Sequence, residues 1–204
     1  MFLKIYPENP NPRYIKTIVD TLNNGGLIIF PTDTVYGLAG SIRQPKTVER
    51  INQIKGNKKE NTNFSFIFNN LSMLSEFTKP ISNDVYKLMK RNLPGPFTFI
   101  LEANNNIPKI FNNKKRTIGI RIPDNPIALT IVEELGHPIM TTSVRDEDEI
   151  LDYMTDPELM NDRFKDIVDI IIDGGYGDNN ASTIVNCTEN EIIIQREGKG
   201  ELIW

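Results

Sequence analysis

The chain has 204 residues, of which 39% are hydrophobic and 25% are charged, and its net charge is −4. A chain of this length buries about 70% of the surface that its unfolded form exposes, so it needs neither disulfides nor a structural metal to fold. It contains one Cys and one His, so a Cys/His zinc site is excluded, and a Ser-His-Asp or Cys-His mechanism would depend on His137 alone.

No repeat, low-complexity segment or Ser/Pro linker divides the sequence, so residues 1–204 are expected to form one domain. The first residues carry no basic segment followed by an apolar run. No stretch approaches the roughly 18 apolar residues of a membrane span. We therefore expect a cytoplasmic protein that does not enter a membrane.

The charge is unevenly placed along the chain. Residues 50–121 hold 13 Lys and Arg against four Asp and Glu, whereas residues 122–204 hold five against 19. A basic middle segment in an acidic protein can steer phosphate-bearing ligands to one face. The alternative is that both surfaces are merely solvated, and the charge pattern alone leaves the two open.

In the first half of the chain, Pro and Gly mark the ends of the expected elements. Pro12 suits the first turn of a helix with apolar residues at helical spacing, and Gly25-Gly26 ends it. Apolar runs predict strands, and Pro94-Gly95-Pro96 turns the chain sharply. The further elements expected here are strands at 27–30, 64–68 and 97–101 and helices at 45–55, 71–77 and 82–91.

In the second half, residues 117–122 alternate with period 2, so the isoleucines face the core while Thr117, Gly119 and Arg121 share the other face. The strand 139–143 places Thr141 and Ser143 on one side. Strands and helices mix without strict alternation, which predicts an α/β sheet with both parallel and antiparallel pairs. The remaining expected elements are helices at 126–135 and 156–165 and strands at 167–172, 182–185 and 192–196.

The segment FPTDTVYGL at residues 30–38 places two hydroxyls, a carboxylate and a phenol directly after a buried strand. Loops at strand ends commonly bind ligands in α/β proteins. A polar turn with Tyr36 as a core aromatic explains the same composition. Spacing alone favours that structural interpretation.

Three basic features could meet an anion. Lys55 ends a helix, where its charge complements the helix C-terminus or reaches a ligand. Arg121, on a strand flanked by isoleucines, needs an anionic partner, which is either a protein carboxylate or a substrate carboxylate or phosphate. Arg196 lies near the end of the last expected strand. The acidic run 146–149 could hold Mg²⁺, but such a run is usually a solvated turn or helix start.

Taken in order, these segments resemble the YrdC/YciO family, the threonylcarbamoyl-AMP synthases and their relatives. The segment 25–38 carries the most specific part of the resemblance. Each of the other motifs is weak evidence alone, but their order along the chain makes them strong evidence together. They are PGPFT at 94–98, GIRIP at 119–123, STIV at 182–185 and REG at 196–198. The resemblance covers nearly the whole chain and matches the short members of the family.

The resemblance implies a twisted open mixed sheet with flanking helices around a concave, basic cavity. It also implies a reaction in which threonine, bicarbonate and ATP give threonylcarbamoyl-AMP and pyrophosphate, for modification of an adenosine in tRNA. Mg²⁺ would accompany the nucleotide, and no protein metal site is implied. Such a reaction needs positioning and charge neutralisation rather than a protein nucleophile, which agrees with the residue inventory.

The resemblance also assigns roles by position. Tyr36 would shape the threonine pocket, and the threonine itself would be held by Thr34, Arg121, Thr141 and Ser182. The nucleotide and its phosphates would be held by Lys55, Thr117, Ser143 and Arg196. The candidate catalytic residues are Lys55, Ser143 and Arg145.

Two motifs depart from the family pattern. Lys55-Gly56-Asn57 stands where synthases carry Lys-x-Arg, and Ser143-Val144-Arg145 stands where they carry Ser-x-Asn. If both loops line one pocket, Arg145 would restore the charge missing at Asn57; alternatively it pairs with the acidic run. With NFSF at 63–66, these departures place the chain closer to the YciO-like branch.

Three functions follow from the sequence. The first is a threonylcarbamoyl-AMP synthase-like nucleotidyltransferase, whose product would pass to transferase partner proteins. The second is a module that binds double-stranded RNA or tRNA with the basic face while the catalytic pocket is degenerate. The third is an adenylate-forming protein that uses another small acid. RNA affinity would fall steeply with salt, whereas nucleotide binding should depend on individual cations.

Overall fold

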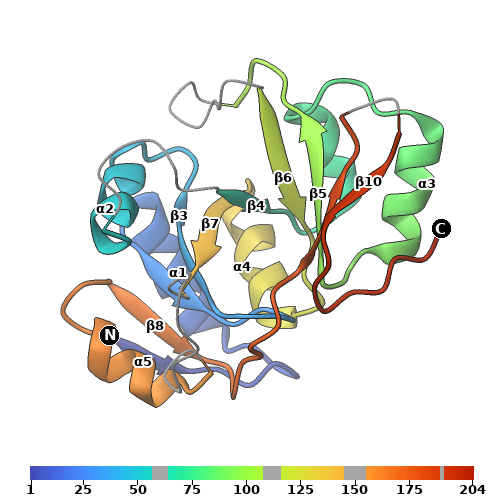
Figure 1. Cartoon of the computed structure of the whole chain (residues 1–204). Helices are drawn as coiled ribbons and strands as arrows, with labels where there is room; N and C mark the ends of the chain where they lie inside the picture. Colours follow the sequence, from blue (N-terminus) through green and yellow to red (C-terminus); the bar gives the residue numbers. More distant parts are fainter. Residues whose placement is uncertain (57–63, 108–115, 145–154, 189–190) are drawn as a thin grey trace.

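The computed structural model describes residues 1–56, 64–107, 116–144, 155–188 and 191–204. Within these residues, ten strands form a mixed sheet with helices on both faces (Figure 1). The strands are β1 Phe2–Lys4, β2 Ile28–Phe30, β3 Gly37–Ser41, β4 Ser65–Ile67, β5 Phe97–Glu102, β6 Thr117–Arg121, β7 Ile139–Ser143, β8 Ile170–Asp173, β9 Thr183–Asn186 and β10 Ile193–Arg196. The helices are α1 Pro12–Asn23, α2 Lys46–Ile54, the 3₁₀ helix η1 Leu71–Glu76, α3 Asn83–Asn92, α4 Pro126–Leu135 and α5 Pro157–Phe164.

The strand order is β1-β8-β2-β3-β7-β4-β6-β5-β9-β10. Parallel pairs join β1 with β8, β2 with β8, β4 with β6, and β5 with β9. The other pairs are antiparallel. The expected mixture of parallel and antiparallel pairs is therefore confirmed, and strands far apart in sequence lie side by side at the centre.

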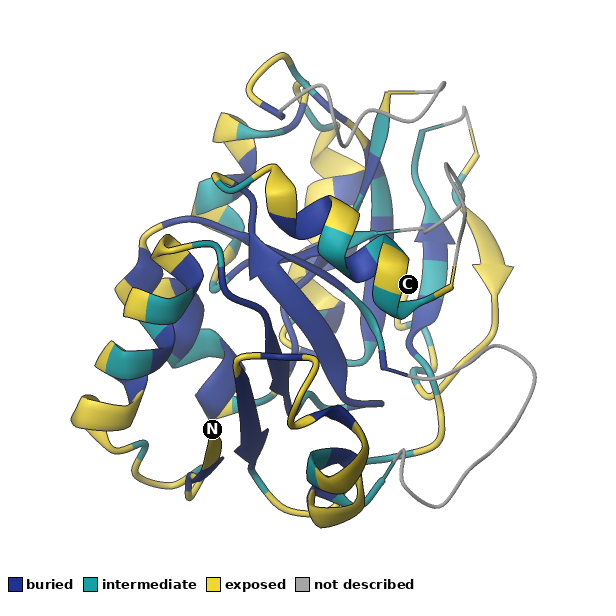
Figure 2. Cartoon of the chain, turned by 90° about the vertical axis from the view of Figure 1, so that its left-hand side faces the viewer, coloured by how far each residue is buried: buried dark blue, intermediate teal, exposed yellow. Residues whose placement is uncertain are grey.

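The helices pack against the two faces of the sheet with two apolar clusters. On one face, α1 and α4 cover Ile28, Phe30, Ile67 and Ile139. On the other face, α2, α3 and α5 contribute to the larger cluster that contains Phe66, Met140 and the isoleucines of β6. Figure 2 shows the consequence, since the central strands are buried while the outer helix surfaces are exposed.

The α1/α4 cluster covers only part of its face. Side chains alternate along a strand, so Thr141 lies on the same face as Ile139, and Ser65 on the same face as Ile67. Ile139 and Ile67 belong to the α1/α4 cluster, but Thr141 and Ser65 do not. The polar end of this face is the place to look for a site.

Two strands were missed by the sequence analysis, and two elements differ in extent or type. The N-terminal strand β1 has three residues, of which only Leu3 is buried, so it gives little local signal. β3 has the sequence GLAGS, whose glycines disfavour strands, but it is buried between β2 and β7. The element expected at 167–172 forms its strand only from Ile170, and the helix expected at 71–77 is a 3₁₀ helix.

Helix α4 begins with a side-chain cap. The Asn125 side-chain oxygen accepts a hydrogen bond from the backbone N–H of Ala128 at 3.1 Å, and Pro126 occupies the first turn. Gly136 ends the helix in the left-handed conformation at φ 71°. The cap therefore fixes where α4 starts, directly after the strand that carries Arg121.

We expect Asn125→Ala to lower the free energy of unfolding by about 1 kcal/mol, because one buried helix-end N–H loses its partner. Urea unfolding followed by circular dichroism measures this change. The matched control is Asn70→Ala, which removes the cap of the short 3₁₀ helix η1. A control that costs as much as Asn125→Ala would contradict a specific role for the α4 cap.

No helix among the residues with described coordinates has the length and apolar character needed to cross a membrane.

Candidate active site

Arg121, at the end of β6, reaches the loop that follows β2. Its Nη2 donates hydrogen bonds to the Asp33 carboxylate and to the Thr34 hydroxyl, each at 2.9 Å. Thr34 is fully buried, and the side chains of Arg121 and Asp33 are each 9% exposed. The basic strand residue singled out in the sequence therefore has a protein carboxylate as its anionic partner.

Arg121 retains an unsatisfied donor. Its Nε is buried and lacks a hydrogen-bond partner among the described residues. Burial lowers the pKa of Arg121, while Asp33 opposes that shift. A buried donor without a partner costs roughly 1–3 kcal/mol, so a ligand oxygen at Nε would recover stability that the protein alone lacks.

On the other side of β6, a second polar group joins β5, β9 and β10. The hydroxyls of Thr98 and Ser182 are 2.8 Å apart. Arg196 donates from Nη2 to the Ser182 carbonyl at 2.7 Å and lies 3.5 Å from its hydroxyl. The charge of Arg196 also lowers the pKa of Arg121, so the two guanidinium groups share one electrostatic environment.

Between these groups and β7, the sheet carries small residues. Ser65 pairs with Gly119 on one side and Thr141 on the other. A Cβ atom at Gly119 would lie 3.0 Å from the Thr98 methyl and 3.3 Å from the Ser65 hydroxyl oxygen, so glycine permits this close approach. Polar side chains therefore continue across the face from β7 to β10.

Lys55 lies at the C-terminal end of α2, and its Nζ donates to the Ser143 carbonyl at 3.3 Å. Two residues predicted to act in nucleotide binding thus contact each other. Arg145 and Asn57 lie outside the described residues, as does the acidic run 146–149. The hypothesis that Arg145 compensates for Asn57 therefore stays a prediction.

The remaining predicted residues take different positions. Thr141 is buried and donates to the Leu38 carbonyl at 3.2 Å. Thr117 is half-buried at the start of β6, on the face of Arg121. Tyr36 belongs to the core, where its hydroxyl donates to the Gly175 carbonyl at 2.6 Å and burial raises its pKa.

The structure therefore brings predicted residues into contact in three pairs: Thr34 with Arg121, Ser182 with Arg196, and Lys55 with Ser143. Sequence reasoning assigned no role to Ser65, Thr98 or Asp33. For Ser65 the available signal was a small polar residue alternating with phenylalanines. For Thr98 the signal was its place inside a motif that was quoted only for the resemblance. For Asp33 it was the carboxylate of the polar loop 30–38, which was considered as a ligand-binding loop without a role for that residue.

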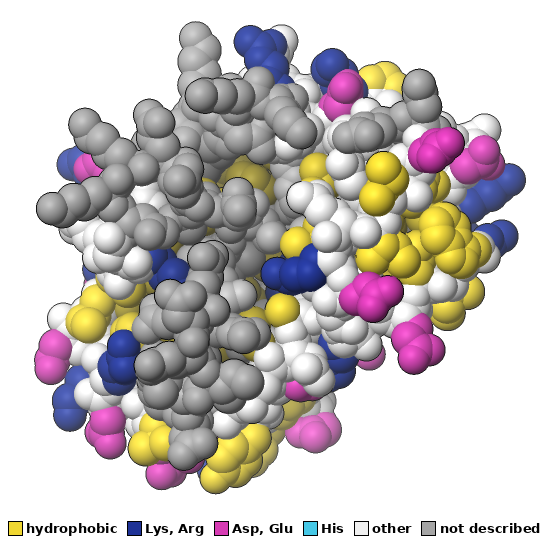
Figure 3. Space-filling model, viewed as in Figure 1, with side chains coloured by type: hydrophobic (Ala, Val, Ile, Leu, Met, Phe, Trp, Pro, Cys, Tyr) yellow, Lys and Arg dark blue, Asp and Glu magenta, His cyan; other side chains and the backbone are white. Residues whose placement is uncertain are grey.

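The molecule is hollowed on the side seen in Figure 3, between the half that contains β3 and β7 and the half that contains β5 and β10. Lys or Arg side chains are visible on both sides of the hollow. Next to Thr34, a cavity of about 450 Å³ is lined by polar groups that include Asp33, Tyr176 and Lys199. Asp178 also lines this cavity, so its lining carries charges of both signs.

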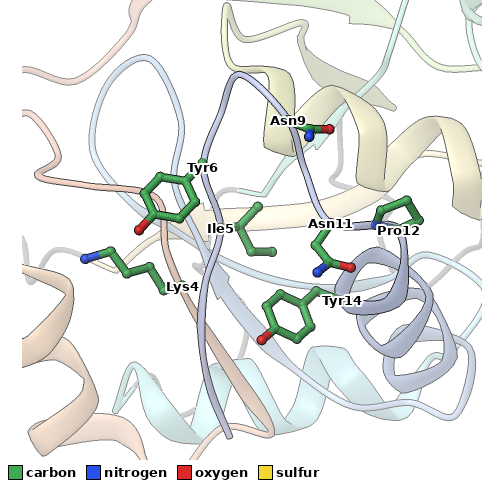
Figure 4. A pocket seen from close by; sticks show the side chains of 7 residues that line it. All are labelled: Lys4, Ile5, Tyr6, Asn9, Asn11, Pro12 and Tyr14. Atoms are coloured by element: carbon green, nitrogen blue, oxygen red, sulfur yellow. The ribbon is translucent and has the colours of Figure 1, made fainter.

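A separate pocket of about 410 Å³ lies between β1, the segment after it and the start of α1. Figure 4 shows that Lys4, Tyr6 and Tyr14 contribute side chains to it. The pocket has none of the predicted site residues, and nothing in its lining indicates a particular ligand.

His137 is 2% exposed, and burial lowers its pKa. Its Nδ1 lies 3.0 Å from the Pro138 carbonyl, within the core. Among the described residues, no group of three or more His, Cys, Asp or Glu side chains gathers to hold a metal. The polar face instead offers hydroxyls and guanidinium groups.

The chain is similar to known proteins in both sequence and structure. The Sua5/YciO/YrdC family model, described as "Telomere recombination", matches residues 20–198. A Haemophilus influenzae protein described as uncharacterized is 40% identical over 98% of this chain and 96% of its own. Escherichia coli YciO is 36% identical, and its crystal structure superposes with a TM-score of 0.91 over 98% of this chain and 97% of that chain.

A threonylcarbamoyl-AMP synthase from Pyrococcus abyssi is 29% identical over 90% of this chain, which spans 54% of that protein. The crystal structure of P. abyssi Sua5 complexed with L-threonine matches 97% of this chain with a TM-score of 0.88 and 27% identity, and this chain spans 57% of it. The chain is thus more similar to the YciO proteins than to this synthase. By the match over residues 20–198 and the full-length similarity to YciO, this chain belongs to the Sua5/YciO/YrdC family.

Proposed function

We propose that this protein is an ATP-dependent enzyme that forms threonylcarbamoyl-AMP, or a closely related carbamoyl adenylate, from an amino acid, bicarbonate and ATP. The observation that supports the proposal most is the contact of Thr34 with Arg121 and of Ser182 with Arg196. The segment that follows Arg196 also reaches the loop of Thr34, because Lys199 donates to the Asp33 carbonyl. The family includes threonylcarbamoyl-AMP synthases, and one related structure is described with L-threonine.

The amino acid would bind at the β6 side of the face. Arg121 supplies a guanidinium group for its carboxylate, and Nε is the donor that lacks a protein partner among the described residues. The Thr34 hydroxyl accepts from Arg121, and the Ser182 hydroxyl lies 2.8 Å from the Thr98 hydroxyl. Hydroxyls donate and accept, so they suit both the amine and the side-chain hydroxyl of threonine.

The nucleotide would bind where the remaining cations lie. Arg196 on β10 provides positive charge beside Ser182, and Lys55 provides it beside the Ser143 carbonyl. Planar guanidinium groups bind phosphate oxygens through two donors at once, and Lys binds them as a point charge. Mg²⁺ would accompany the triphosphate and neutralise part of its charge.

The chemistry requires two steps. The threonine amine and bicarbonate form a carbamate and release water. A carbamate oxygen then attacks the α-phosphorus of ATP, and the bond to the β-phosphate oxygen breaks to release pyrophosphate. No protein nucleophile takes part. The contribution of the protein is to hold the reactants in line and to neutralise charge.

The decisive experiment mixes the protein with ATP, Mg²⁺, threonine and bicarbonate and measures pyrophosphate release. We expect release only when threonine and bicarbonate are both present, and the adenylate should be identified by mass spectrometry. Release that threonine does not stimulate would contradict the threonine assignment. Release with another amino acid in its place would redirect the proposal to that substrate.

RNA binding is the alternative outcome of the same test. If no pyrophosphate is released, tRNA affinity should be measured at two salt concentrations, since phosphate contacts make affinity fall steeply with salt. Strong salt-dependent binding without turnover would favour the RNA-binding function over the enzymatic one. In the enzymatic case, the adenylate would pass to partner proteins that modify tRNA in the cytoplasm.

A further inference from the structure

Asp33 connects four segments around the candidate active site. Its Oδ1 accepts from Arg121 Nη2 at 2.9 Å, and its Oδ2 accepts from the backbone N–H of Asp124 at 3.0 Å. Its backbone carbonyl accepts from Lys199 Nζ at 2.7 Å. The loop after β2, the end of β6, the start of α4 and the segment after β10 therefore meet at one residue.

These contacts fix the guanidinium group of Arg121 from one end. Both Asp33 and Thr34 accept from Nη2. The same group leaves Nε without a partner among the described residues. Each of the two side chains in the ion pair is 9% exposed, so solvent cannot easily replace either contact.

The charges favour one more anion. Asp33 neutralises one positive charge, and Arg196 acts on Arg121 as a second. A substrate carboxylate at Nε would be attracted by both guanidinium groups, whereas without Asp33 the buried charge of Arg121 would lose its ion-pair partner.

We propose that Asp33 is a positioning residue: it holds Arg121 by its Nη2 end, so that the Nε–H is presented to the carboxylate of the bound amino acid. This inference rests on the proposed function, because it assumes an amino-acid substrate at Arg121. In this role Asp33 does not contact the substrate itself. It fixes the orientation of Arg121, whose Nε–H donates to the substrate.

The test is Asp33→Asn, which keeps the size of the side chain and one acceptor but removes the charge. We expect the dissociation constant for threonine, measured by calorimetry, to rise about tenfold, because the charge-assisted hydrogen bond at Nε is misplaced. The dissociation constant for ATP should change less than about twofold. Equal weakening of threonine and ATP binding would overturn the proposal.

A second readout separates positioning from a general structural role. L-Threoninamide lacks the carboxylate, so the native protein should bind threonine more tightly than the amide. In Asp33→Asn this preference should fall about tenfold, while amide binding stays nearly constant. A variant that weakens both ligands by the same factor would show that Asp33 serves only the fold.

The matched control is Asp169→Asn. Asp169 also pairs with an arginine, Arg50, at 3.0 Å and accepts from the backbone N–H of Leu27 at 2.7 Å. It lies beside the start of β2, whereas Asp33 follows the end of that strand. We expect the control to leave threonine affinity and the amide preference unchanged, and a control that reproduces the loss would overturn the proposal.

If Asp33→Asn does not fold, the coupling is measured with Asp33→Glu, which keeps the charge and displaces it by one methylene group. The same loss of preference for threonine over the amide is expected, and an unchanged preference would overturn the proposal. A native protein that binds ATP but neither threonine nor another amino acid would refute the proposed substrate. A native protein that binds threonine and an Asp33→Asn variant that binds it equally well would refute only the positioning role.

Discussion

Arg121→Lys is expected to lower kcat/KM for threonine about a hundredfold. Lysine keeps the positive charge opposite Asp33, but it has one nitrogen where Arg121 uses Nη2 for two protein contacts and retains Nε as a further donor. The lysine ammonium holds all its donors at one nitrogen, so it cannot occupy the positions of Nη2 and Nε together. Pyrophosphate release at varied threonine concentration measures the loss.

The control for this prediction is Arg50→Lys, whose arginine forms an ion pair of 3.0 Å with Asp169 on a more exposed surface. We expect that variant to retain native kcat/KM. ATP affinity should change less than about threefold in Arg121→Lys. A parallel loss of ATP or tRNA affinity would show that the arginine supports the whole face rather than the amino-acid site.

Gly198→Ala is expected to weaken both substrates. A Cβ atom at this position would lie 2.3 Å from the Ala181 carbonyl oxygen and 2.6 Å from the Ser182 carbonyl carbon. Those neighbours are backbone atoms, so either β9 or the segment after β10 must shift. The free energy of unfolding should fall by about 2 kcal/mol, and the melting temperature by about 4–8 °C.

Both ligands should be affected because the displaced segments carry Ser182 and Arg196. We expect kcat/KM for threonine and for ATP each to fall more than about tenfold, since misplacement by an ångström is costly in an oriented site. The exposed neighbour Glu201→Ala is the control and should retain native activity and melting temperature. Selective loss of one substrate in Gly198→Ala would contradict the shared movement of both residues.

The sequence predicted the elements whose signals are local. Pro12 at the start and Gly25-Gly26 just beyond the end located α1 closely, and the range expected for α4, 126–135, matches the observed helix. The period-2 pattern of β6 correctly separated its isoleucines from Thr117 and Arg121. These features depend on neighbours within a few residues, which sequence patterns record.

The sequence did not predict β1 and β3, because their strand character comes from pairing with other strands rather than from their own residues. The glycines and small residues of β3 favour a loop, and pairing with β2 and β7 overrides that preference. The order of strands was equally out of reach. Local patterns do not specify that β4 lies between β6 and β7.

For the site, residue types were easier to predict than connections. The need of Arg121 for an anion was visible in the sequence, and the structure supplies Asp33 from 88 residues earlier. The contact between Thr98 and Ser182 spans 84 residues and had no sequence signal of its own. The resemblance grouped many of the residues, but only the coordinates show which side chains touch.

The position of β10 affects when the site is completed during synthesis. Arg196 and the Gly198 segment lie on and after the last strand of the described sheet, whereas Thr34 lies near the other end of the chain. A nascent polypeptide in which β10 has not yet been made contains most of the core residues but lacks Arg196, the cation beside Ser182. Ligand would consequently bind and stabilise only molecules in which β10 has paired with β9, so shorter products gain no protection from it.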